Sequence, residues 1–136
     1  MRRTIFVSLL LLCCCTSPGK LMNDEKAERI IFGRTGGFTN IPEQYVFFLN
    51  GRLFKMEYDS LVKITRVNGK KIDAIETSLT GMDFANIEIN DPGNMTYFIR
   101  VIRKDFQNEV KWSDNDRYPQ LKELYDSFMA LVNEKQ

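Results

Sequence analysis

The fold is decided by residues 45–56, which read YVFFLNGRLFKM. Two runs rich in aromatic and aliphatic side chains, residues 45–49 and 53–56, flank the dipeptide Asn50-Gly51. This dipeptide is a strong hairpin signal, because a type I′ turn needs a positive φ at both central residues and Asn and Gly tolerate it. The sequence therefore predicts two antiparallel strands joined by a type I′ turn.

Four further segments predict strands on either side of this hairpin. Residues 28–34 hold a short apolar run that ends at a glycine-rich loop, and residues 61–67 alternate in a short strand pattern. Residues 95–103 read MTYFIRVIR and have the best strand composition of the chain. Residues 109–113 can pair back with that strand, so a second antiparallel pair is expected.

Two amphipathic helices follow from apolar residues at helical spacing. Asn68 is a suitable N-cap for the first helix, which is expected to end near Gly81. Pro119 suits the first position of the second helix, where its missing N–H costs nothing. The apolar stripe of the first helix is Ile72, Ile75, Leu79 and Met82, and that of the second is Leu121, Leu124, Tyr125, Phe128, Leu131 and Val132.

Strands and helices in this order predict an α+β fold, an antiparallel sheet of four to six strands with two helices packed on one face. The chain has 136 residues, and about 120 remain if a leader is removed, which suits one domain over residues 28–136. A monomer is expected.

The N-terminus has the pattern of a secretory signal peptide. Arg2 and Arg3 precede an apolar run at residues 5–12, which is too short for a bilayer span of about 20 apolar residues. Residues 1–14 are therefore expected to be removed. Residues 15–27 contain Pro, Gly, Ser and charges and are expected to form a lipidated tether.

The run LLCCC at residues 11–15 resembles the lipobox of bacterial lipoproteins. Cys15 fits best as the lipidated residue, with Leu12 as the aliphatic position, and Cys14 and Cys13 are less suitable. This resemblance implies a diacylglyceryl anchor in the cell envelope, with the outer membrane as the expected site. An ordinary cleaved signal peptide and an unprocessed apolar helix are the alternatives.

The composition argues against several classes of function. The chain has no His, and its three Cys all lie at residues 13–15, so imidazole and thiol catalysis in the domain are excluded. Without Arg2 and Arg3, 17 of the 19 basic residues remain against 18 acidic ones, a balance that does not favour nucleic acid. The prediction is a non-enzymatic protein with no cofactor and no metal site, the turn 114–116 (DND) being far short of a cation loop.

The candidate contact residues lie in the glycine-rich loop after the first strand. Phe38 follows the pair Gly36-Gly37 directly, and Thr39 and Ile41 come next. Exposed apolar side chains on loops can bind a partner protein. The alternative is that Phe38 and Ile41 fold back and close the core.

The order of features resembles emfourin-like domains, small bacterial proteins that include inhibitors of thermolysin-type metallopeptidases. The matching features are segments 30–34, 36–38 (GGF), 45–56, 70–82 with Phe84, 97–103, 109–113 and 119–132. The resemblance implies a protein-binding domain, with a metallopeptidase as one candidate partner and residues 36–42 as the contact loop. A structural lipoprotein that docks in a membrane-associated complex is the alternative.

Overall fold

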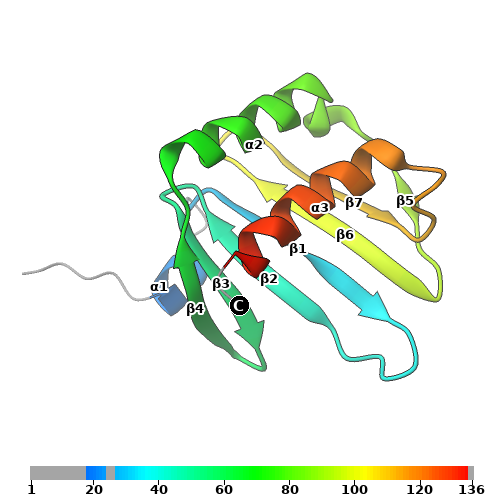
Figure 1. Cartoon of the computed structure of the whole chain (residues 1–136), viewed down its shortest axis with the longest axis horizontal. Coiled ribbons are helices and arrows are strands. Elements are labelled where there is room, and N and C mark those ends of the chain that lie inside the picture. Colours follow the sequence, from blue (N-terminus) through cyan, green and yellow to red (C-terminus); the bar gives the residue numbers. More distant parts are fainter. Residues whose placement is uncertain (1–17, 24–26, 135–136) are drawn as a thin grey trace, which may run out of the picture.

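A computed structural model describes residues 18–23 and 27–134 of the chain. They form an α+β fold in which one sheet carries helices α2 and α3 on one face (Figure 1). The predicted signal peptide and Cys13, Cys14 and Cys15 lie outside the described residues. The elements are α1 (Pro18–Asn23), β1 (Arg29–Gly36), β2 (Glu43–Phe48), β3 (Arg52–Glu57), β4 (Ser60–Arg66), α2 (Gly69–Gly81), the 3-10 helix η1 (Phe84–Asn86), β5 (Asn90–Asp91), β6 (Met95–Ile102), β7 (Gln107–Trp112) and α3 (Pro119–Asn133).

The sheet is larger than the predicted four to six strands and is not purely antiparallel. Seven strands lie in the order β4-β3-β2-β1-β6-β7-β5, and β5 pairs in parallel with β7. Strand β5 has only two residues, and the alternation that leads into it, IEIN at residues 87–90, is at the lower limit of a strand pattern and was not predicted as a strand. The parallel pairing arises because the chain returns from α2 along the outside of β7, where the Lys111 N–H donates to the carbonyl of Ile89 at 3.0 Å.

The predicted hairpin forms between β2 and β3, but its turn is not type I′. Of the turn residues only Gly51 has a positive φ, 95°, and its N–H donates to the carbonyl of Phe48 at 2.9 Å. Residues 49–51 are thus a three-residue loop with a left-handed glycine at its end. A contact distant in sequence holds this turn, since the Val67 N–H donates to the carbonyl of Gly51 at 2.7 Å.

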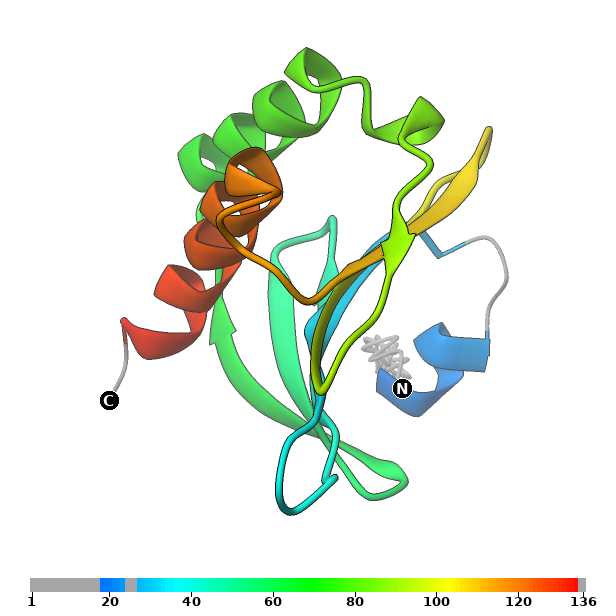
Figure 2. The same cartoon turned by 90° about the vertical axis from the view of Figure 1, so that its right-hand side faces the viewer.

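Both helices are confirmed, and they cover the same face of the sheet (Figure 2). The Asn68 side chain caps α2 by accepting from the Lys71 N–H at 3.1 Å. Large aromatic side chains fill the space between the helices and the sheet, with Phe32 stacked on Tyr45 and on Phe128. All six predicted stripe residues of α3 are buried. This face therefore holds the main hydrophobic core.

The opposite face of the sheet carries a second, smaller apolar cluster, which the sequence patterns did not predict. Its buried members are Ile31, Val46, Phe48, Phe54 and Phe98. Met22 of α1 packs against this cluster, and Figure 2 shows α1 on the side of the sheet away from α2 and α3. A short helix therefore lies within the segment expected to be a tether. No helix among the described residues is long and apolar enough to span a bilayer.

Candidate functional site

Exposed apolar side chains gather at one end of the sheet, here called the loop end. It comprises the β1–β2 loop (residues 37–42) and the β3–β4 turn, which lie together at the bottom of Figures 1 and 2. Phe38 and Tyr58 are fully exposed, and Ile41 is 72% exposed. The alternative that Phe38 and Ile41 close the core is therefore wrong, because the loop carries both side chains away from it.

Gly36 and Gly37 determine the direction in which the β1–β2 loop leaves the sheet. Gly36 has a φ of 97°, and a Cβ at this position would lie 2.1 Å from the carbonyl oxygen of Asn94. The Gly37 N–H donates to the same oxygen at 2.8 Å. Left-handed φ and close backbone approach both require glycine at position 36. The predicted glycines thus position the exposed side chains of Phe38 and Thr39.

A polar clamp holds the base of this loop. Arg34 and Glu43 are cross-strand partners on β1 and β2, and Arg34 Nε donates to Glu43 Oε2 at 2.7 Å. The Tyr45 hydroxyl donates to Glu43 Oε1 at 2.6 Å. This hydrogen bond, followed by that from Arg34, lowers the pKa of Glu43 despite its partial burial, and burial raises the pKa of Tyr45. The clamp therefore keeps Glu43 ionised and the loop base closed.

Tyr58 is the second large side chain of the loop end, and the sequence analysis missed it. It occupies the first central position of the two-residue loop between β3 and β4, with a φ of 54°. Glycine is the preferred residue at a hairpin position with positive φ, and a bulky residue there costs about 1–3 kcal/mol. The available signal was an aromatic residue in the four-residue connection 57–60 between two predicted strands.

A groove runs between the β1–β2 loop and the β3–β4 turn. Ile41 and Pro42 line one wall, Met56 and Tyr58 line the other, and its volume is about 690 Å³. Lys55 and Glu57 form an ion pair of 3.3 Å at its rim. Apolar walls with a charged rim are the arrangement expected of a protein contact surface.

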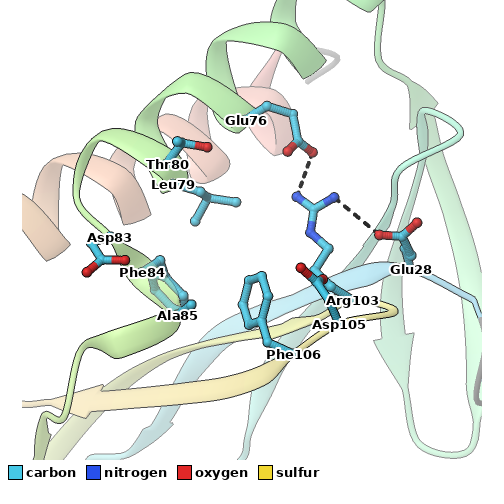
Figure 3. Close-up of a pocket in the computed structure, with 10 residues that line it drawn as sticks. All are labelled: Glu28, Glu76, Leu79, Thr80, Asp83, Phe84, Ala85, Arg103, Asp105 and Phe106. Atoms are coloured by element: carbon cyan, nitrogen blue, oxygen red, sulfur yellow. Dashed lines mark hydrogen bonds and ion pairs between the residues drawn. The ribbon is translucent and has the colours of Figure 1, made fainter.

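A hollow with charged lining lies at the opposite end of the sheet, between α2, η1 and the β6–β7 turn (Figure 3). Its volume is about 350 Å³. Arg103, only 12% exposed at its side chain, donates to Glu76 at 2.6 Å and forms an ion pair with Glu28 at 3.6 Å. Because Arg103 engages both carboxylates, it cross-links α2 to the sheet, and we assign this hollow a structural role.

The DND turn uses its oxygens within the fold. Asp114 Oδ1 accepts from the N–H groups of Asp116 and Arg117, and Asn115 Oδ1 accepts from Trp112 Nε1 at 2.9 Å. Over residues 18–23 and 27–134, no cluster of three or more Asp, Glu, His or Cys side chains could hold a metal ion. These contacts explain the motif as the connection that orients α3.

No protein-family model matches the chain, and a search among curated proteins also finds no match. The function is therefore inferred from the geometry of the loop end itself.

Proposed function

We propose that this protein is a lipid-anchored, non-enzymatic protein of the cell envelope whose domain binds another protein through the β1–β2 loop. The observation that carries the proposal is the full exposure of Phe38 on a loop whose two ends are held. Loops of this kind present binding residues from a rigid scaffold.

The energetic case rests on area and on preorganisation. Moving a fully exposed Phe side chain into a partner's pocket contributes about 1.5–3 kcal/mol. The loop is already held by the Gly37 contact to Asn94 and by the Arg34–Glu43 pair, so little conformational entropy is lost on binding. A single aromatic side chain on a fixed loop can therefore act as the central contact of a small interface.

The lipid anchor is the second element of the proposal. The lipobox-like sequence places it at Cys15, or at Cys14 or Cys13 if processing occurs earlier. Two acyl chains on one residue hold a protein firmly at a membrane, whereas one chain holds it reversibly. A Cys15→Ser variant is expected to lose metabolic labelling with palmitate, and continued labelling would transfer the assignment to Cys14.

The partner class suggested by the emfourin-like features is a thermolysin-type metallopeptidase. The full chain, purified in detergent, should reduce the activity of such a peptidase at micromolar concentration. Phe38→Ser should weaken the inhibition by at least about tenfold, the loss of one buried aromatic contact. Val62→Ser is the matched control, since Val62 is an exposed apolar residue on β4 outside the loop. Full peptidase activity in the presence of the wild-type chain would exclude inhibition.

A structural lipoprotein that docks in a membrane-associated complex is the second candidate. The packing of α1 on the sheet favours it, because it holds the domain close to the membrane anchor rather than at the end of a long tether. A photocrosslinker in place of Phe38 should then trap one defined envelope protein in cells, whereas one in place of Lys104, at the opposite end of the sheet, should not. Failure to recover a defined partner from position 38 would argue against both protein-binding versions.

A further inference from the structure

We propose that the β3–β4 turn rests on the bilayer that holds the lipid anchor, with Tyr58 in the headgroup region. The inference depends on the proposed anchor at Cys15. It extends the proposed function by specifying that a protein bound at Phe38 lies in or on the same membrane.

The length of chain between the anchor and the domain is the first argument. Helix α1 begins at Pro18, only three residues after Cys15. Three peptide steps of 3.8 Å span at most about 11 Å. The membrane surface that holds the acyl chains must therefore approach the first turn of α1.

The position of α1 is the second argument. A hollow of about 310 Å³ lies between α1 and the β3–β4 turn, lined by Gly19 and Met22 on one side and by Met56 and Tyr58 on the other. Met56 and Tyr58 also line the groove that continues to Ile41. Phe38 lines neither of these two hollows. Tyr58 is thus the fully exposed apolar side chain next to α1, and the β1–β2 loop that carries Phe38 lies farther from α1 (Figures 1 and 2).

The chemistry of Tyr58 suits a lipid headgroup region. Tyrosine combines an apolar ring with a polar hydroxyl, and it is enriched where membranes meet water. Its ring is fully exposed and its φ is 54°, so packing within the domain does not offset the strain of this backbone conformation. A contact between the ring and a surface outside the domain would offset this strain.

The charges around the turn define the kind of lipid. Lys55 and Glu57 form an ion pair with each other, and Asp59 adds a negative charge beside Tyr58. A surface without excess positive charge gains no attraction from anionic lipid. The contact should therefore form on zwitterionic phosphatidylcholine and should not strengthen when phosphatidylglycerol is added.

The test is fluorescence quenching of the full lipidated chain reconstituted in phosphatidylcholine vesicles with brominated acyl chains. Trp112 is the single tryptophan of the chain and is fully buried, so its contribution is a constant background. Tyr58→Trp introduces a reporter at the turn, and Lys104→Trp is the matched control at the opposite end of the sheet. The added emission of Tyr58→Trp should fall, as expected for an interfacial aromatic residue, and that of Lys104→Trp should stay unchanged.

The outcomes separate the inference from the function it extends. Equal quenching of the Tyr58→Trp and Lys104→Trp variants would overturn the membrane contact and leave the protein-binding proposal intact. A chain that carries no lipid would overturn both the anchor and this inference. A Phe38→Trp variant should be quenched less than Tyr58→Trp, and equal quenching would also overturn the arrangement, because the binding loop would then lie in the bilayer.

Discussion

The two ends of the sheet are built in opposite ways. At the end with the β6–β7 turn, Phe84 is almost fully buried and Arg103 joins two carboxylates, one on α2 and one just before β1. At the loop end, Phe38 and Tyr58 are fully exposed and Tyr58 has a strained backbone. The first end uses large side chains for stability. The second presents them to solvent, where they are accessible for the contacts proposed above.

The strongest test of this contrast is the same substitution at both ends. Phe84→Ala should lower the free energy of unfolding by about 3–4 kcal/mol, because it empties a packed site. Phe38→Ala should change it by less than about 0.5 kcal/mol, the usual effect at an exposed position. Urea denaturation followed by circular dichroism measures both. A large loss of stability in Phe38→Ala would mean that the loop packs within the domain.

The ion-pair network at the end opposite the loops should give the next largest effect. Arg103→Gln should cost about 1–2 kcal/mol, less than for a fully buried pair because Glu76 and Glu28 are partly exposed. The surface pair Lys122–Asp126 provides the control, since Lys122→Gln should leave the stability almost unchanged. Equal effects of Arg103→Gln and Lys122→Gln on thermal unfolding would remove the structural role assigned to Arg103.

The strained turn at the loop end predicts a gain in stability. Tyr58→Gly should raise the free energy of unfolding by about 1 kcal/mol, because glycine adopts a positive φ without steric cost. The same variant should lose the membrane contact proposed for Tyr58. Tyr58→Phe is the control, since it keeps the ring and the strain. A destabilised Tyr58→Gly variant would show that the ring supports the fold.

The smallest expected effect is the pH dependence of the clamp beneath the loop. The pKa of Glu43 is lower in the folded than in the unfolded chain, through hydrogen bonds from Tyr45 and Arg34. Its contribution is therefore present above the unfolded pKa and is lost as the pH falls through the folded value. The stability difference between wild type and Glu43→Gln should be below about 1 kcal/mol at pH 7, since the pair is partly exposed. It should shrink on acidification in denaturation curves from pH 6 to pH 3, and a constant difference would contradict the clamp.

The periodic segments were predictable because their own residues carry the pattern. The apolar stripe of α3 and the alternation around Trp112 each define one face that must be buried. This holds whichever element packs against that face. Strand β5 was not predictable, because its two residues pair only through the path of the chain around β7. The turn at Asn50-Gly51 differed from the predicted type because Val67, distant in sequence, binds the carbonyl of Gly51.

The candidate site likewise has features that the sequence predicted and features that it did not. The Gly36-Gly37-Phe38 loop could be predicted from the sequence, since paired glycines allow a turn with positive φ directly before a large apolar residue. Exposure of Phe38 was not visible, because an apolar residue after a turn can fold inward or outward with the same local sequence. Tyr58 joined the site only because β3 and β4 bring their turn beside the groove at Ile41.

By itself, the sequence determined the identity of α2, α3 and most strands, and the absence of His and of Cys beyond residue 15. These follow from local periodicity and composition, which need no knowledge of neighbours. Only the tertiary structure decided which end of the sheet is sealed and which is apolar and open, and that α1 lies next to Tyr58. Such properties depend on contacts between residues far apart in the chain. These contacts form, and contribute free energy, only after the strands have paired.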